Sequence, residues 1–203
     1  MNTNRKTATV VGLGLLTALV IVLQAFASSI RFGVFNITLV LVPIIVGAAI
    51  YGWYAGAWLG FVFGVVVLLT DAGVFLAVNV PGTIFTCIVK GAMAGVVSGL
   101  IYRATSKKNR LLAAVLAGIA APVTNTGIFL ICCRLFFYDT IAGWAAGLGF
   151  SNVGLYMILG LAGTNFLTEL VINLVLAPAV VTIINTALRG KTEESGKKSV
   201  SHA

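Results

Sequence analysis

The sequence predicts an all-α integral membrane protein, with six transmembrane helices in one bundle and both termini in the cytoplasm. Of its 203 residues, 60% are hydrophobic and only 9% are charged, and the mean hydropathy is +1.09. A typical soluble domain carries about 25% charged residues, so this composition is typical of a membrane protein. Apolar runs recur along the chain, and each is close to the roughly twenty residues that span a bilayer.

Six apolar runs define the expected helices. They cover residues 8–28, 37–52, 54–71, 83–102, 111–134 and 153–188. The first follows Arg5 and Lys6 and is long enough to span the bilayer, so we interpret it as a helix rather than a cleavable signal peptide. The second and third are separated so closely, at Gly52-Trp53, that they should form a hairpin. The sixth is longer than the bilayer requires, and Pro178 is expected to kink it or to let its end leave the membrane.

Basic residues predict the orientation of these helices. The net charge is +8, and ten of the thirteen Lys and Arg residues lie in three clusters at helix ends, namely Arg5, Lys6, Arg103, Lys107, Lys108, Arg110, Arg189, Lys191, Lys197 and Lys198. An even number of spans places all three clusters on one side, which the positive-inside rule identifies as the cytoplasm. The charge therefore indicates topology rather than a nucleic-acid partner.

The longer connections then lie outside the cell, at residues 29–36, 72–82 and 135–152. Long connections often carry function, so we expect these loops to form a lid over a binding site. Trp144 and Tyr138, taken alone, fit an interfacial aromatic belt equally well. Residues 189–203 are polar and lack aromatic side chains. We therefore expect a disordered cytoplasmic tail after a transmembrane domain of residues 1–188.

A polar stripe runs along the sixth expected helix. Asn165, Glu169 and Asn173 stand four residues apart, a spacing that keeps them on one helical face. A carboxylate near the bilayer centre costs about 3 kcal/mol by insertion scales, so this face should meet a cavity or another helix. Asn165 is expected to line a pocket. Glu169 and Asn173 lie deeper, and for them interhelical pairing is the preferred interpretation.

The fourth expected helix carries Thr83, Thr86 and Lys90 on one face. Lys90 lies about 10 Å from the outer end of this helix. Its ammonium group could extend to the interface, could bind an anionic ligand, or could pair with Glu169.

The fifth expected helix contains the segment Pro122-Val-Thr-Asn-Thr-Gly127. A proline that frees backbone groups, followed by hydrogen-bonding side chains, is typical of broken segments that line cavities. Asn125 and Thr126 are therefore expected at the ligand, with interhelical hydrogen bonding as the alternative. Arg134 lies nine residues beyond Asn125, about 180° away on a regular helix, so the two would share a pocket only if the helix were distorted.

Small residues indicate where helices approach closely. Gly14 and Ala18 form a small-xxx-small pair on the first helix. Glycines recur every four residues at Gly52, Gly56, Gly60 and Gly64, and this ridge is expected to pack within the chain rather than against a partner.

The absence of several motifs argues against an enzyme. The sequence has no Gly-x-x-x-x-Gly-Lys-Ser/Thr motif for ATP and no His-Glu-x-x-His, and its single histidine is His202 in the tail. One carboxylate in the membrane core is too few for paired-carboxylate chemistry. We therefore expect no catalytic residue, no metal and no cofactor in this chain. The runs also lack the obvious inverted repeat of a stand-alone secondary transporter.

The layout resembles the substrate-binding subunits of energy-coupling factor (ECF) vitamin transporters. The resemblance rests on Gly14-Leu-Leu-Thr-Ala18 in the first helix, on Asn36-Ile-Thr-Leu before the glycine-rich hairpin around Tyr51-Gly52, and on Pro122…Asn125 in the fifth helix. It covers about residues 8–188. The overall pattern is more specific than any one of these motifs, which are degenerate.

This resemblance implies a binder in a prokaryotic cell membrane that captures a vitamin from outside. It implies docking through Gly14 and Ala18 onto a transmembrane coupling subunit, with two cytoplasmic ATPase subunits that use ATP and topple the binder. Gly14 replaces an alanine that is common in the family. The implied substrate-binding residues, together with neighbours placed by their chemistry, are Asn36, Asn79, Thr83, Thr86, Lys90, Asn125, Thr126, Arg134, Asn152, Tyr156 and Asn165.

The implied cargo is pantothenate, because the sequence looks most like that branch and because Lys90 and Arg134 suit a carboxylate. Two other classes stay open at this stage. A stand-alone carrier or channel for a small polar solute would transport without ATPases, and a structural membrane subunit would bind no small molecule.

Overall fold

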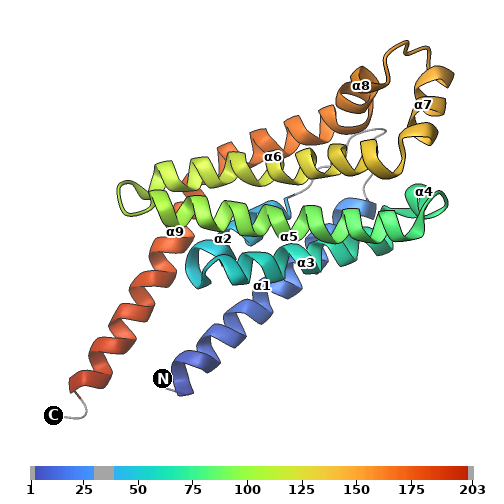
Figure 1. The fold of residues 1–203 in the computed structure, drawn as a ribbon. Helices are drawn as coiled ribbons and strands as arrows, with labels where there is room; N and C mark the ends of the chain where they lie inside the picture. Colours follow the sequence, from blue (N-terminus) through green and yellow to red (C-terminus); the bar gives the residue numbers. More distant parts are fainter. Residues whose placement is uncertain (1–2, 30–38, 201–203) are drawn as a thin grey trace.

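A computed structural model describes the backbone of residues 3–29 and 39–200 and the side chains of residues 7–29 and 39–188. The described chain is almost entirely helical (Figure 1). In order, its elements are α1 (Thr3–Ser29), α2 (Leu41–Tyr51), α3 (Trp53–Thr70), α4 (Gly73–Leu76), α5 (Val80–Thr105), α6 (Arg110–Phe136), α7 (Tyr138–Gly147), α8 (Val153–Tyr156), the π-helical segment η1 (Met157–Gly163) and α9 (Thr164–Val200).

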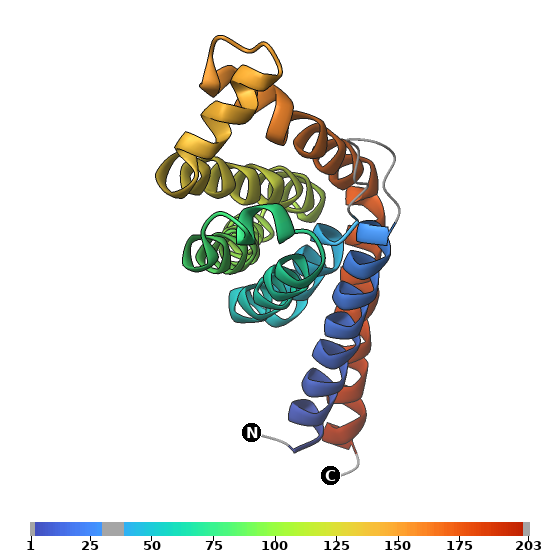
Figure 2. The same ribbon diagram turned by 90° about the vertical axis from the view of Figure 1, so that its right-hand side faces the viewer.

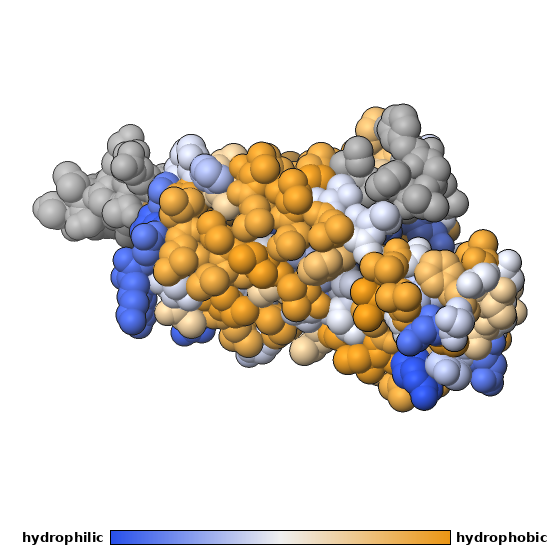
Figure 3. All heavy atoms as spheres, turned by 90° about the horizontal axis from the view of Figure 1, so that it is seen from above, coloured by the Kyte–Doolittle hydropathy of each residue, from blue (hydrophilic) through white to orange (hydrophobic). Residues whose placement is uncertain are grey.

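Five helical segments are long and apolar enough to cross a membrane. They are Thr7–Ser29, Trp53–Thr70, Val80–Thr105, Arg110–Phe136 and Val153–Leu188. Helix α2 has 11 residues, which corresponds to about 16 Å and is shorter than the roughly 30 Å hydrocarbon core. On the face shown in Figure 3, hydrophobic residues form a broad band, and hydrophilic residues gather toward its ends. The chain is thus an all-helical, multi-pass membrane protein, and the sixth span stays a prediction.

The fourth expected helix, residues 83–102, is shorter than α5 at both ends. The expected start was residue 83, but α5 begins at Val80 because Asn79 caps it, with the Asn79 side chain accepting a hydrogen bond from the Gly82 backbone N–H at 2.9 Å. The expected outer connections at 72–82 and 135–152 contain the short helices α4 and α7. The third outer connection, residues 29–36, lies outside the described residues apart from Ser29.

The expected glycine ridge packs within the chain, as predicted. Gly56, Gly60 and Gly64 of α3 face the backbone of α5, where a Cβ added to any of them would overlap a backbone oxygen. Gly91 and Gly95 of α5 are constrained in the same way by the backbone of α3. The two helices therefore touch backbone to backbone, which only residues without a side chain allow. Gly52 does not join this contact. It links α2 to α3 with a φ of 98°, a conformation that L side chains rarely adopt.

The structure can be compared with two expectations about proline. Pro122 was expected to mark a broken segment, but α6 runs as one α-helix from Arg110 to Phe136 with Pro122 buried inside it. The irregular segment is η1 instead, where seven residues are π-helical. Pro178 lies inside α9 without ending it, and Figures 1 and 2 show that this helix changes direction between its first and last parts.

The ends of the chain lie together. In Figure 1 both termini and the connection between α5 and α6 lie at one end of the molecule, and α4, α7 and α8 lie at the other. Figure 2 confirms that the two termini are close to each other. A chain that crosses a membrane an even number of times has both of its ends on the same side, and this arrangement agrees with that. Which end faces the cytoplasm stays a prediction. Helix α9 continues to Val200, so the segment expected to be disordered begins as helix, and a domain boundary at residue 188 also stays a prediction.

Candidate ligand-binding site

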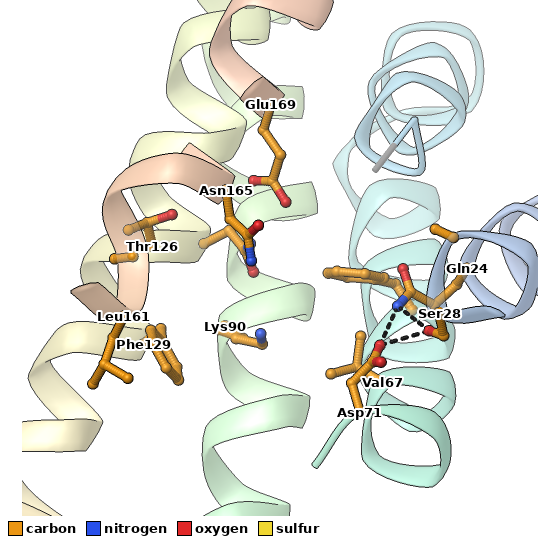
Figure 4. A pocket seen from close by; sticks show the side chains of 14 residues that line it. Gln24, Ser28, Val67, Asp71, Lys90, Thr126, Phe129, Leu161, Asn165 and Glu169 are labelled. Carbon is orange, nitrogen blue, oxygen red and sulfur yellow. Dashed lines mark hydrogen bonds between the residues drawn. The ribbon is translucent and has the colours of Figure 1, made fainter. Parts of the chain in front are cut away.

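A cavity of about 140 Å³ lies between α1, α3, α5, α6, η1 and α9 (Figure 4). Polar and apolar side chains from all six elements line it. They are Gln24, Ala27, Ser28, Phe63, Val67, Asp71, Lys90, Asn125, Thr126, Phe129, Leu161, Ala162, Asn165 and Glu169. Such a mixture of an apolar surface and a few polar groups is typical of small-molecule sites.

The wall formed by α1 and α3 is held by internal hydrogen bonds. Gln24 Nε2 donates to Asp71 Oδ2 at 2.8 Å, and Ser28 Oγ donates to the same oxygen at 2.6 Å. Gln24 Nε2 also lies 3.2 Å from Ser28 Oγ. Gln24 and Ser28 are four residues apart and so lie on one face of α1, which Asp71 at the end of α3 joins. This network fixes the position of all three side chains, as Figure 4 shows.

Lys90 of α5 lies between the two sides of the cavity (Figure 4). Its Nζ is 5.3 Å from the centroid of the Phe129 ring and 6.0 Å from that of Phe63, distances at which aromatic faces attract a cation. Glu169, considered as a partner for Lys90 from the sequence, lines the same cavity. Aromatic faces satisfy an ammonium group less completely than an oxygen ligand does, so Lys90 is suited to bind an anion.

Helix α6 contributes Asn125, Thr126 and Phe129 to the cavity. Asn125 is only 6% exposed, and its Oδ1 has no hydrogen-bond partner among the described residues. A buried carbonyl oxygen without a partner costs about 1–3 kcal/mol. A ligand that donates a hydrogen bond to Asn125 would remove this cost.

The π-helical segment η1 and the start of α9 complete the cavity. Leu161 and Ala162 of η1 and Asn165 and Glu169 of α9 line it. Asn165 was expected there. Glu169 borders the same cavity, and its expected pairing between helices stays a prediction. Asn173, the third member of the stripe, is buried where its Cβ and backbone approach Gly118 of α6. A π-helical turn frequently marks a functional site because it shifts the direction of the side chains around it.

Four residues expected at the ligand make hydrogen bonds near the starts of α5 and α8, and a contact of any of them with the ligand stays a prediction. Thr83 Oγ1 donates to the Asn79 backbone oxygen at 2.7 Å, and Thr86 Oγ1 donates to the Gly82 backbone oxygen at 2.6 Å. Both hydroxyls thus bind their own helix. Asn79 caps α5, and Asn152 caps α8 by accepting a hydrogen bond from the Leu155 N–H at 3.1 Å. None of these four lines the cavity.

The remaining expected residues lie elsewhere or outside the described chain. Tyr156 is buried in a cluster around α7 and α8, and its ring is 5.3 Å from that of Phe150. The Arg134 guanidinium stacks on Tyr138 at 4.0 Å. Since α6 is a regular helix, Arg134 points away from the Asn125 side, as its spacing predicts. Asn36 lies outside the described residues.

The segments expected to form a lid pack against one another. Phe75 of α4 contacts Trp144 of α7 with ring centroids 5.7 Å apart. Trp144 therefore belongs to an aromatic cluster, and its place in an interfacial belt stays a prediction. No residue of α4, α7 or α8 lines the cavity within the part of the chain that the structure describes.

Sequence reasoning missed the contribution of α1 and α3. Gln24, Ser28 and Asp71 were not expected at the site, because the family resemblance implied a ligand held by the fourth to sixth expected helices. A signal was present. Gln24 is a polar residue inside an apolar run, and Ser28 follows it by four residues.

Helix α1 also presents an open face. Gly14 and Ala18 are exposed, and a Cβ added at Gly14 would meet no atom within 4 Å. Large apolar side chains such as Val10, Val11 and Leu15 are exposed on the same helix. Only 17% of the most apolar part of α1 is buried, compared with 39% for α5. This helix therefore has surface available for lipid or for a partner protein.

Comparisons with known proteins agree with one another. The family model of the substrate-specific component of ECF transporters matches residues 8–181. The chain is also 28% identical over 200 residues to the pantothenic acid transporter PanT of Lactococcus lactis subsp. cremoris, a match that covers 90% of this chain and 96% of the relative. Both findings indicate a transporter and not an enzyme.

Proposed function

This chain belongs to the substrate-specific components of ECF transporters, and from that premise we propose that it binds pantothenate and delivers it into the cytoplasm. Membership of the family supports vitamin transport across a membrane. The identity of the cargo rests on the similarity to PanT, whose name states pantothenic acid transport, and on the chemistry of the cavity.

The observation that carries the proposal is that Lys90 and the hydrogen-bond acceptor Asn125 line the same cavity. Pantothenate has a carboxylate at one end and an amide and hydroxyl groups along its length. The carboxylate would bind the Lys90 ammonium through a charge-assisted hydrogen bond. A hydroxyl or amide N–H would donate to Asn125 Oδ1, which has no hydrogen-bond partner in the part of the chain that the structure describes. The apolar side chains Val67, Phe129 and Leu161 would contact the methyl-bearing part of the molecule.

Transport in this proposal requires partner subunits. The sequence offers no nucleotide-binding motif, so a transmembrane coupling subunit and two cytoplasmic ATPases would supply the energy. Helix α1 would dock on the coupling subunit through the open face around Gly14 and Ala18. The cell membrane of a prokaryote is the proposed location, with the cavity accessible from outside.

Ligand release and titration test the binding proposal. The purified, detergent-solubilised chain is denatured, the small molecules released are identified by mass spectrometry, and pantothenate is titrated by calorimetry beside riboflavin and folate. Saturable binding of pantothenate at one molecule per chain is expected. If another vitamin bound and pantothenate did not, the chain would still be a vitamin transporter, but its cargo would be that other vitamin.

Reconstitution tests the need for partners. Liposomes that contain this chain alone are expected to show no pantothenate uptake, and liposomes that also contain the coupling subunit and ATPases are expected to take it up with ATP. Gly14→Leu and Ala18→Leu should abolish this uptake while leaving binding unchanged. The matched control is Leu19→Met, which changes an exposed side chain of the same helix about 100° around the axis from Ala18. Uptake by the chain alone would instead support a stand-alone carrier.

A further inference from the structure

Gln24 is a buried polar residue of α1, the helix that carries the proposed docking surface. It is 3% exposed and lines the cavity from α1. Its amide has one defined orientation. Nε2 donates to Asp71 Oδ2, and an ionised carboxylate can only accept, so the nitrogen must face Asp71. The carbonyl oxygen is therefore fixed on the other side of the amide.

Among the residues that the structure describes, that carbonyl oxygen, Gln24 Oε1, has no hydrogen-bond partner although it is buried. Most buried polar atoms in proteins have a partner, and an exception next to a cavity indicates a ligand or an ordered water. The Ser28 hydroxyl does not donate to it, because Ser28 Oγ donates to Asp71. The network thus holds an acceptor at the cavity.

The position of Gln24 complements the other polar groups of the cavity. In Figure 4, Lys90 lies between the side that carries Gln24 and the side that carries Thr126 and Asn165. A ligand whose anionic group binds Lys90 would have α1 on one side and α6 with α9 on the other. If this ligand carried a hydrogen-bond donor on the α1 side, that donor would bind Gln24 Oε1.

We propose that Gln24 determines ligand specificity by accepting, through Oε1, a hydrogen bond from a hydroxyl or amide N–H of the bound molecule. This inference rests on the proposed function, because it concerns the same cavity. It adds a contact from α1, and it assigns Asp71 and Ser28 a positioning role, since they fix the amide. Affinity then depends on whether the ligand carries this donor, because a buried acceptor discriminates strongly against an analogue that lacks it.

A double-mutant cycle between protein and ligand tests the proposal. Affinity is measured by calorimetry for pantothenate and for analogues in which each hydroxyl in turn is replaced by hydrogen and the amide N–H by an ester oxygen. The wild-type chain is expected to bind at least one analogue about tenfold more weakly than pantothenate, the usual effect of one buried hydrogen bond. In Gln24→Met, which keeps length and volume, the same analogue and pantothenate should bind equally well.

Thr17→Val is the matched control on α1. Thr17 Oγ1 donates to the Leu13 backbone oxygen of its own helix and does not line the cavity, so this variant should keep the tenfold discrimination. Gln24→Leu serves as a second variant, and the melting temperature of each variant establishes that it is folded.

Three outcomes separate the alternatives. If Gln24→Met keeps the discrimination against every analogue, Gln24 does not touch the ligand and the inference is overturned while the proposed function stands. If Gln24→Met weakens pantothenate and all analogues by the same factor, Gln24 acts only through packing, and the inference is again overturned. If the folded wild-type chain does not bind pantothenate at all, the proposed function is overturned and this inference with it.

Discussion

The contact between α3 and α5 and the cavity beside it are built in opposite ways. At the contact, glycines bring two helices together until their backbones touch, and a single added Cβ would overlap a backbone oxygen. At the cavity, helices stand apart, and polar side chains such as Lys90 and Asn125 occupy the space between them. Gly91 and Lys90 are neighbours on α5, so one helix takes part in both regions.

This difference shows how a membrane protein can hold polar groups at fixed positions. Helix association in lipid depends on close packing rather than on burial from water, so backbone contact between α3 and α5 makes a rigid support. The support fixes the backbone at Lys90 and leaves its side chain directed at the cavity. A site whose residues lie on rigid elements holds its geometry better than one built on loops.

Gly95→Ala is expected to give the largest effect, on stability. The new Cβ would overlap the Gly56 backbone oxygen, and backbone cannot rotate away as a side chain could. The free energy of unfolding in mixed micelles should fall by about 3 kcal/mol, the upper part of the range for overpacking.

Gly127→Ala on α6 is the matched control for that measurement. Its added Cβ would meet no atom within 4 Å, so stability should stay equal or rise slightly through the better helix propensity of alanine. Equal stability of the two variants would mean that α3 and α5 can separate without loss, and the contrast between a rigid contact and an open cavity would not hold.

The glycine ridge shows what the sequence predicts well. A four-residue repeat of glycine has a direct geometric meaning, because it defines a smooth stripe on a helix, and Gly56, Gly60 and Gly64 pack as predicted. The helical spans were predictable for a similar reason, since the length and polarity of a run decide whether it can cross a bilayer. The family resemblance followed from the same pattern and is confirmed.

The site was only partly predictable, because a polar residue in an apolar run has two possible uses. Thr86 and Asn125 are both polar residues within apolar runs of the sequence. The Thr86 hydroxyl donates to the backbone of its own helix, whereas Asn125 lines the cavity. The choice depends on where neighbouring helices lie. Asp71 was missed because it becomes a cavity residue only when α1 brings Gln24 and Ser28 next to it.

Lys90→Met is expected to give the largest effect on binding. It removes the cation that we propose for the pantothenate carboxylate and keeps much of the apolar volume. Affinity measured by calorimetry should fall about a hundredfold, as expected when a charge-assisted hydrogen bond is lost. The affinity for pantothenol, which has an alcohol in place of the carboxylate, should fall much less. Lys90→Arg should retain part of the affinity. A similar loss for both ligands would show that Lys90 supports the cavity without binding the anion.

Asn125→Leu is expected to have an intermediate effect. It replaces an amide whose Oδ1 makes no hydrogen bond with an apolar side chain of similar size. Pantothenate should bind about tenfold more weakly because one ligand donor loses its acceptor. The folded state should be equally or more stable, because a buried oxygen without a partner has been removed. Unchanged affinity at unchanged stability would place the ligand away from α6.

Thr86→Val is expected to have the smallest effect, although Thr86 and Lys90 are four residues apart on the same helix. The Thr86 hydroxyl donates to the Gly82 backbone oxygen at 2.6 Å. That oxygen already accepts a hydrogen bond within the helix, so the loss of the hydroxyl in Thr86→Val should have little effect. Valine has nearly the same shape, and affinity for pantothenate should change by less than about twofold, within the usual range for sites away from a ligand. Calorimetry on Thr86→Val beside Asn125→Leu makes the comparison direct. If Thr86→Val weakened binding as much as Asn125→Leu, the ligand would extend along α5 toward its capped end, and the support and the site would not be separate regions of this helix.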